Sequence, residues 1–200
     1  NSELKILVLG ASGLIGRTIY HHLKGYPQYD VIGTLRANGP YNKRKNNQLK
    51  YNIDALDFNK LSALVHVVKP SQIINCIGVT KHVPAQSDST TLIQLNSVLP
   101  HFLAKLSNVV NARLIHISTD CVFSGQTGNY SDEDATDALD IYGKSKALGE
   151  LTDVRNLTIR TSTIGHEFGT QHGLLEWFLA QHETCLGYRS AIFSGLPTIT

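Results

Sequence analysis

Residues 4–16 of this chain read LKILVLGASGLIG, and this stretch decides the fold. It begins with a nearly continuous apolar run, which is typical of a central parallel strand covered on both faces. Three glycines follow at positions 10, 13 and 16, and an apolar helical pattern then continues through Ile19, Tyr20 and Leu23. The stretch therefore predicts a strand, a tight glycine turn and a helix in direct succession.

The glycine turn suits a bound dinucleotide. A residue without a Cβ lets the backbone approach a pyrophosphate, and the N-terminus of the following helix stabilises the negative charge. The spacing is G-x-x-G-x-x-G rather than the commoner G-x-G-x-x-G, and the alternative is a tight turn that binds nothing. We favour the binding interpretation because a clear strand precedes the turn and a clear helix follows it.

Strands and helices alternate along the rest of the chain. Apolar runs predict strands at 30–34, 50–53, 72–77, 114–117 and 156–160, helical patterns predict helices at 58–68, about 89–107 and 173–181, and polar residues predict loops at 40–47 and 79–88. Asp57 is the expected N-cap of the helix at 58–68. This alternation predicts an α/β fold with a doubly wound parallel sheet of the Rossmann type.

The composition indicates an ordinary soluble globular protein. Hydrophobic residues make up 42% of the chain and charged residues 17%, and 200 residues suffice for one substantial core. The net charge of +2 does not indicate nucleic acid, and the basic run at 43–45 has asparagine neighbours rather than stacking aromatics. No stretch approaches about 18 apolar residues and the N-terminus shows no signal pattern, so we expect a cytoplasmic protein without membrane contact.

The cysteines and histidines predict neither a disulfide framework nor a metal site. Cys76, Cys121 and Cys185 are odd in number and far apart, without C-x-x-C spacing. The nine histidines include no H-x-x-x-H pattern. We therefore expect no metal.

A second informative segment starts where the strand at 114–117 ends in Ser118 and Thr119. Further along, Asp140 is a suitable N-cap for a helix that carries Tyr142 and Lys146. Residues four apart on a helix share a face, so the phenol and the ammonium can point into one site.

These side chains form a proton-transfer set. A phenol has a pKa of about 10, and a neighbouring ammonium is expected to lower it toward the operating pH. A hydroxyl of Ser118 or Thr119 could hold a substrate carbonyl near the Tyr142 hydroxyl, which suits carbonyl reduction or its reverse. Alternatively, Tyr142 packs its helix on the sheet and Lys146 is solvated, but the glycine turn favours the catalytic interpretation.

Four motifs occur together in this chain. They are Gly10-x-x-Gly13-x-x-Gly16, Asn75-Cys76-Ile77-Gly78, Ser118-Thr119-Asp120 and Tyr142-x-x-x-Lys146. Their order and spacing resemble the short-chain dehydrogenase/reductase superfamily. The segments STDCVFSG, YSDED and YGKSKALGE are most similar to its extended branch, specifically the dTDP-4-dehydrorhamnose reductase family. The similarity spans essentially the whole chain from Leu4 onward.

The resemblance implies an NAD(P)H-dependent reduction of the 4-keto group of a nucleotide-linked deoxy sugar, in nucleotide-sugar or cell-surface polysaccharide biosynthesis. By matching positions, Tyr142 is the expected general acid and Thr119 orients the carbonyl. Lys146 is expected to tune Tyr142 and to bind the nicotinamide ribose. The expected cofactor-binding residues are Gly10, Ser12, Gly13, Leu14, Ile15, Asn52, Ile53, Cys76, Ile77 and Gly78, together with Tyr142 and Lys146.

Arg36 bears on the choice of cofactor. In this fold the end of the second strand lies beside the adenosine ribose, where a carboxylate favours NAD. Here Thr34, Leu35 and Arg36 stand at that place without a carboxylate. A guanidinium can bind a 2′-phosphate, so we expect a preference for NADP(H), with NAD(H) also compatible.

Three alternatives remain open beside the reductase. A sugar 4,6-dehydratase is disfavoured because Cys121 replaces the glutamate of the T-D-E motif. An epimerase of the same branch uses the same Tyr and Lys, and a non-catalytic NADP-binding regulatory subunit resembles the same family. A homodimer is compatible with the resemblance.

The resemblance also predicts the layout of the domains. Residues 1–200 are expected to form an NAD(P)-binding Rossmann domain that includes the start of a substrate-binding region near 163–200. Family members are longer, and the segment AIFSGLPTIT resembles the strand that leads into their C-terminal substrate lobe. We therefore expect only the beginning of that lobe here.

Overall fold

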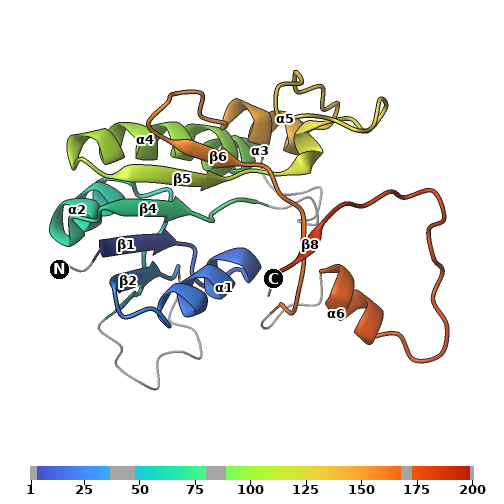
Figure 1. Cartoon of the computed structure of the whole chain (residues 1–200), viewed down its shortest axis with the longest axis horizontal. Coiled ribbons are helices and arrows are strands. Elements are labelled where there is room, and N and C mark those ends of the chain that lie inside the picture. The colour runs from blue at the N-terminus through green and yellow to red at the C-terminus, as the bar shows by residue number, and fades with distance from the viewer. Residues whose placement is uncertain (1–3, 37–47, 80–88, 168–172, 199–200) are drawn as a thin grey trace.

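Six parallel strands form the central sheet of the computed structural model, which describes residues 4–36, 48–79, 89–167 and 173–198 (Figure 1). The strands are β1 (Leu4–Leu9), β2 (Tyr29–Thr34), β3 (Leu49–Lys50), β4 (Gln72–Asn75), β5 (Arg113–Ile117) and β6 (Leu157–Ile159). Their order in the sheet is β3-β2-β1-β4-β5-β6, which confirms the predicted doubly wound Rossmann-type fold. The order reverses between β1 and β4, and ligands of such sheets bind outside the strand ends at this point.

Helices cover both faces of the sheet. The helices of the described residues are α1 (Leu14–Leu23), α2 (Phe58–Val68), α3 (Ser89–Ile93), α4 (Leu99–Val109), α5 (Ile141–Leu148) and α6 (Leu174–Leu179), of which α6 lies apart from the six-stranded sheet (Figure 1). The two predicted N-caps are confirmed. Asp57 accepts a hydrogen bond from the Lys60 amide at 2.9 Å, and Asp140 accepts one from the Gly143 amide at 2.9 Å.

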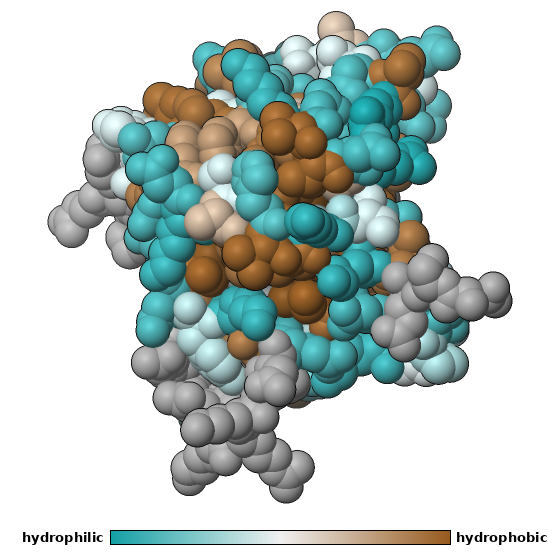
Figure 2. All heavy atoms as spheres, turned by 90° about the vertical axis from the view of Figure 1, so that its left-hand side faces the viewer, coloured by the Kyte–Doolittle hydropathy of each residue, from teal (hydrophilic) through white to brown (hydrophobic). Residues whose placement is uncertain are grey.

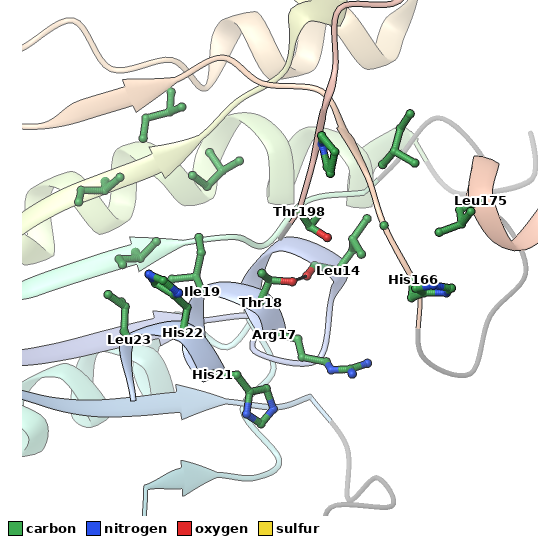
Figure 3. A pocket seen from close by; sticks show the side chains of 17 residues that line it. Leu14, Arg17, Thr18, Ile19, His21, His22, Leu23, His166, Leu175 and Thr198 are labelled. Atoms are coloured by element: carbon green, nitrogen blue, oxygen red, sulfur yellow. Dashed lines mark hydrogen bonds between the residues drawn. The ribbon is translucent and has the colours of Figure 1, made fainter. Parts of the chain in front are cut away.

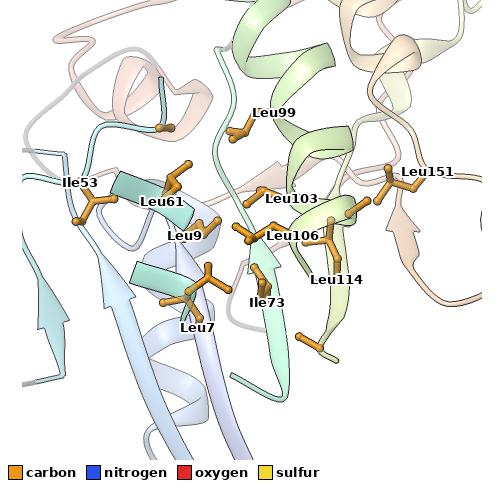
Figure 4. Close-up of a cluster of buried hydrophobic side chains, with 14 residues drawn as sticks. Leu7, Leu9, Ile53, Leu61, Ile73, Leu99, Leu103, Leu106, Leu114 and Leu151 are labelled. Atoms are coloured by element: carbon orange, nitrogen blue, oxygen red, sulfur yellow. The ribbon is translucent and has the colours of Figure 1, made fainter. Parts of the chain in front are cut away.

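The main apolar core lies between the sheet and the helices α2 and α4 (Figure 4). Alternate residues of β1 point into it, including Leu7 and Leu9, and Leu61 and Leu103 meet them from the helices. The residues between them, such as Val8, face α1 and pack against Tyr20 on the other side. A strand that is buried on both faces needs an unbroken apolar run, and the sequence of β1 supplies it.

Helix α3 continues into α4 through a π-helical turn, η2 (Gln94–Val98), so the helix predicted at about 89–107 is interrupted. Pro100 explains the turn because it has no N–H to donate to the Asn96 carbonyl four residues earlier. That carbonyl instead lies against Gly149, where a Cβ would collide with it. The π turn thus brings the α3–α4 segment close to the end of α5.

Three strands are shorter than predicted, and the one expected at 156–160 loses one residue at each end. The strand expected at 50–53 ends at Lys50 because Asn52 has a φ of 57°, in the left-handed region. The strand expected at 72–77 ends at Asn75. The Ile77 amide donates to the Asn75 side-chain oxygen at 3.1 Å instead of to a neighbouring strand. The predicted loop at 40–47 and most of the loop at 79–88 lie outside the described residues.

The last described segment forms a small separate sheet. Strand β7 (Thr163–Ile164) pairs in parallel with β8 (Leu196–Pro197), and α6 lies between them in the sequence. Helix α6 has no buried residue. This segment coincides with the predicted start of a substrate-binding region near 163–200, and that assignment stays a prediction.

The end of the molecule where the strands begin has a surface of both apolar and hydrophilic residues. Seen from this side, apolar residues gather in the middle of the face and hydrophilic residues surround them (Figure 2). Two exposed valines lie at the C-terminal ends of helices on this side of the molecule, Val67 in α2 and Val109 in α4. The titratable side chains predicted to be catalytic lie at the other end, where the strands finish.

Candidate active site

A pocket of about 600 Å³ opens at the carboxyl ends of β1, β2 and β4. Eight of the predicted cofactor-binding residues line it: Gly10, Ser12, Gly13, Arg36, Ile53, Cys76, Ile77 and Gly78. The remaining wall is formed by Thr34, Asp54, Ala55, Leu56, Val79, Thr91, Leu92 and Leu95. Most of this group therefore lines one cavity, and its role in binding a cofactor stays a prediction.

The backbone of the glycine turn explains why Gly10 and Gly16 are needed. Gly10 has a φ of 80°, which favours glycine, and its amide donates to the Thr34 hydroxyl at 3.1 Å. A Cβ at Gly16 would collide with the Gly10 carbonyl, so the helix packs directly on the turn. A Cβ at Gly13 would only meet the Gly10 oxygen at 3.6 Å, and this glycine borders the pocket. The turn therefore fits a dinucleotide phosphate group, which needs close backbone approach.

Four predicted cofactor residues lie elsewhere, and one of them is Tyr142 in α5, which does not line this pocket. Leu14 lines a different pocket, on the α1 face of the sheet. Ile15 in α1 and Asn52 after β3 do not line the glycine-turn pocket. Lys146 stands at its edge, because a Cβ on Gly78 would lie 3.7 Å from the Lys146 Nζ.

Thr119 and Ser118 have different surroundings at the end of β5. Thr119 caps the 3₁₀ turn η3 (Asp120–Val122), and its hydroxyl accepts from the Cys121 amide at 3.2 Å. The same hydroxyl is close enough to Tyr142 to form a hydrogen bond that acts on the phenol pKa. Ser118, by contrast, donates to Glu150 at 2.8 Å. Of the two hydroxyls considered from the sequence, the Thr119 hydroxyl is therefore the one beside Tyr142.

Burial sets the protonation of both helix residues. Burial raises the pKa of the Tyr142 phenol above its ordinary value of 10.0, and the hydrogen bond with Thr119 only partly opposes this. Burial lowers the pKa of Lys146 to about 8, against the opposing influence of Glu150 and Cys76. The expectation that Lys146 lowers the phenol pKa is wrong for this structure. The cause is burial, which withdraws Tyr142 from water and raises the pKa of its phenol.

The profile of the RmlD substrate-binding domain family matches residues 4–174 of this chain. The chain belongs to this family.

Relatives and solved structures of known name agree with the assignment to the RmlD family. Methionine adenosyltransferase 2 subunit beta from Mus musculus is 30% identical over 153 residues, which is 76% of this chain and 43% of that protein. A dTDP-4-dehydrorhamnose reductase from Aggregatibacter actinomycetemcomitans is 28% identical over 196 residues, which is 92% of this chain and 59% of that protein. A hypothetical dTDP-4-dehydrorhamnose reductase from Sulfolobus tokodaii superimposes with a TM-score of 0.67 and 31% identity, covering 80% of this chain and 56% of that chain. This RmlD-family chain thus spans about half the length of the relatives it matches.

In this RmlD-family chain, helix α5 is held by residues that sequence reasoning missed. The Asn96 amide group donates to the Ser145 hydroxyl at 3.1 Å and to the Val79 carbonyl at 3.2 Å. Its oxygen accepts from the Val79 amide at 2.9 Å, and Ser97 donates to the Ser145 carbonyl at 2.7 Å. These contacts join the pocket wall at Val79 to the helix that carries Tyr142. The only signal in the sequence was Pro100, which predicts a break in the preceding helix.

A buried histidine of β5 contacts Asn75 at the end of β4. His116 on β5 is fully buried, and the Asn75 amide lies 3.1 Å from its Nδ1. If Asn75 donates, the histidine proton is on Nε2, and that atom has no partner among the described residues. Burial lowers the pKa of His116 to about 3, with Lys146 and His101 acting in the same direction.

A larger pocket, of about 1060 Å³, lies on the α1 face of the sheet (Figure 3). Its floor consists of isoleucines of the sheet and its sides come from α1, β7 and β8: Ile74, Ile115, Ile117 and Ile159 below, with Leu14, Arg17, Thr18, Ile164, His166 and Thr198 among the walls. Leu175 of α6 reaches its rim. Neither Thr119 nor Tyr142 lines this pocket, and the turn glycines Gly10 and Gly13 do not line it either. The glycine turn lines the smaller pocket, so the predicted cofactor site lies there, and Lys146 stands at its edge.

Two further features of the described ranges concern metals and membranes. Within them, no three histidine, cysteine or acidic side chains gather in a way that could hold a metal ion. None of the helices found there is long and apolar enough to cross a membrane.

Proposed function

We propose that this chain is part of an NAD(P)H-dependent reductase that acts on the 4-keto group of a nucleotide-linked deoxy sugar. The observation that carries the proposal is that Tyr142 and Lys146 share helix α5, with the Thr119 hydroxyl beside the Tyr142 phenol and the Lys146 ammonium at the edge of the glycine-turn pocket. Two of the relatives reported above are named as dTDP-4-dehydrorhamnose reductases, and they support the same reaction.

The protonation state of Tyr142 favours the direction of reduction. A carbonyl oxygen that gains electron density needs a proton, and the donor must be protonated before the reaction begins. The raised pKa of Tyr142 keeps its phenol protonated at neutral pH. The Thr119 hydroxyl donates to the Asp120 carboxylate at 3.2 Å in this structure, and with substrate bound it would donate to the same carbonyl oxygen instead, which would orient and polarise the carbonyl.

Lys146 supplies positive charge close to the place where the phenolate forms. An ammonium in a water-poor site stabilises a developing anion more strongly than it does in water. With a pKa of about 8, Lys146 is charged in most molecules at neutral pH. Its hydrogen bond to the Ile117 carbonyl fixes the ammonium between β5 and α5.

The glycine-turn pocket is the proposed place of the cofactor. A bound reduced nicotinamide supplies the hydride that the carbonyl carbon accepts. Gly10, Gly13 and the N-terminus of α1 would hold the pyrophosphate, and Arg36 in the pocket wall would bind a 2′-phosphate. We therefore propose NADPH as the preferred cofactor.

A non-catalytic regulatory subunit is the second candidate. The mouse relative is the beta subunit of methionine adenosyltransferase 2, which supports this alternative. In that case the same pocket binds a dinucleotide and Tyr142 has no catalytic task. An epimerase of the same branch is a third candidate within the enzymes.

The test is a turnover screen of the longest natural form of the protein with dTDP-, UDP- and GDP-linked 4-keto sugars and both reduced cofactors. With the best substrate, Tyr142→Phe should lower kcat by about 10²–10⁴, the usual contribution of a general acid. Tyr188→Phe, at an 87% exposed position, is the matched control and should leave turnover unchanged. Dinucleotide binding without turnover of any of these sugars would instead support the regulatory subunit.

A further inference from the structure

Asp120 directly follows Thr119, and its carboxylate accepts hydrogen bonds from two hydroxyls. The Thr119 hydroxyl donates to Oδ1 of Asp120 at 3.2 Å. The Ser162 hydroxyl, which lies 42 residues further along the chain, donates to the same oxygen. Among the described residues, these two side chains are the donors to this carboxylate. Thr119 and Ser162 therefore share one acceptor.

The backbone holds Ser162 in this place from two sides. Ser162 directly precedes β7, and its carbonyl accepts from the Leu196 amide of β8 at 3.0 Å. At the end of β6, the Ile159 carbonyl accepts from the Ser118 amide at 2.7 Å, so the chain that leads to Ser162 leaves the sheet beside the end of β5. Ser162 thus joins the small β7–β8 sheet to the segment that carries Thr119.

The Thr119 hydroxyl has a single proton to donate. Its oxygen accepts from the Cys121 amide at 3.2 Å, and its proton is directed to Asp120 in this structure. In the proposed reaction the same proton turns to the substrate carbonyl oxygen. Asp120 then loses a donor, and a carboxylate oxygen that is left without a partner in a half-buried place carries a cost in free energy.

We propose that Ser162 is a positioning residue for Thr119: its hydroxyl keeps the Asp120 carboxylate hydrogen-bonded while the Thr119 proton turns to the substrate. With Ser162 in place, the release of Thr119 leaves Oδ1 of Asp120 with a donor. Without Ser162, the carboxylate depends on Thr119, and the substrate has to compete with it for that proton. The value of Ser162 for catalysis rests on the proposed function, whereas the sharing of the acceptor does not.

The first test is a double-mutant cycle with the best substrate of the turnover screen. Ser162→Ala should lower kcat/KM by about 5- to 10-fold, at the lower end of the cost of an unsatisfied acceptor because Asp120 is only half-buried. Ser162→Thr keeps the hydroxyl and should retain wild-type turnover. Ser71→Ala, at an exposed position before β4, is the matched control.

The cycle shows whether Ser162 acts through Asp120. Asp120→Ala removes the shared acceptor, so adding Ser162→Ala to it should cause little further loss. Fully additive losses would mean that Ser162 acts on the substrate by another route, and they overturn the proposal.

A second measurement needs neither substrate nor cofactor. The Thr119 hydroxyl lowers the pKa of the Tyr142 phenol against burial. Once Ser162→Ala commits the Thr119 proton to Asp120, this phenol pKa should rise by roughly 0.7–1 pH unit, which is the same 5- to 10-fold factor on a logarithmic scale. A fluorinated tyrosine at position 142 titrates at lower pH and reports the midpoint by fluorine NMR. Asp120, Cys121 and Asp140 also act on the phenol, and the Ser162 variants leave them in place.

An unchanged phenol midpoint in Ser162→Ala overturns the proposal. The same rise in Ser162→Thr also overturns it, because that result would reflect altered packing rather than a lost hydroxyl. Ser162→Cys, which keeps the size of the side chain and has only a weak donor, should raise the midpoint in the same direction and replaces Ser162→Ala if that variant does not fold. The titration is independent of the Tyr142→Phe result on turnover, so a failure of the proposed function and a failure of this proposal are distinguishable.

Discussion

Replacing Lys146 by methionine should make the folded chain more stable at neutral pH. The Lys146 side chain is buried, and its pKa falls from 10.5 to about 8 on folding. Folding therefore disfavours the charged form, and at pH 7 the chain carries that cost in full. A methionine of similar length removes the charge and fills the space with a flexible apolar side chain.

The magnitude follows from the pKa shift. A shift of about 2.5 units at about 1.36 kcal/mol each amounts to roughly 3 kcal/mol. The loss of the hydrogen bond to the Ile117 carbonyl lowers this gain in the free energy of unfolding by about 1 kcal/mol. The net gain of about 2 kcal/mol corresponds to a rise in Tm of roughly 4–8 °C for a chain of this size.

The pH dependence gives this prediction a second, independent check. Between pH 8 and 10.5 the unfolded chain keeps a proton that the folded chain has released, so wild-type stability rises with pH in this window. The advantage of Lys146→Met should therefore shrink from pH 7 to pH 10. Thermal unfolding by calorimetry at both values, with the exposed Lys144→Met as control, measures it. Lower stability of Lys146→Met at pH 7, or an equal gap at both values, refutes the argument from burial.

Two further predictions concern other parts of the site. Arg36→Ala should weaken NADPH binding by about 10- to 150-fold, the cost of one charge-assisted contact, and leave NADH nearly unchanged in calorimetric titrations; equal losses for both would place Arg36 away from the 2′-phosphate. His116→Gln should resist acid better than the wild type. The pKa of His116 falls from 6.5 to about 3 on folding, so protonation of the unfolded chain lowers wild-type stability as the pH drops through this window. Chemical unfolding at pH 7 and pH 4 checks this, and parallel losses in both proteins would contradict it.

Local patterns in the sequence predicted the fold and the framework of the site. The apolar run at 4–9 and the glycines that follow define β1 and its turn, because each needs only its own neighbours to be recognised. The caps Asp57 and Asp140 were predictable for the same reason, since a cap and the amide it accepts lie within one turn. By contrast, the left-handed conformation of Asn52 ended a strand that propensity alone would have extended.

Contacts between distant residues could not be predicted from spacing. Ser118 and Thr119 are adjacent in the sequence, and both offered a hydroxyl to the substrate. Successive residues of an extended segment point to opposite sides, so only one of them can face Tyr142. The Ser118 hydroxyl donates to Glu150, which lies 32 residues away in the sequence, so Thr119 is the hydroxyl beside Tyr142. No periodicity in the sequence reports such a pair.

The phenol and the ammonium show most clearly why a motif does not determine its own chemistry. The Tyr-x-x-x-Lys spacing suggested that Lys146 would lower the phenol pKa, but both groups are buried and burial acts on them with opposite signs. It favours the neutral form of each, so the phenol pKa rises and the ammonium pKa falls. A protonated phenol is ready to donate, which suits reduction, while the ammonium needs a fixed counter-charge to stay protonated. The Glu150 carboxylate raises the Lys146 pKa against burial, and Arg160, just after β6, pairs with that carboxylate. Whether Tyr142 and Lys146 act as an acid and its charged neighbour is therefore decided by residues outside the motif.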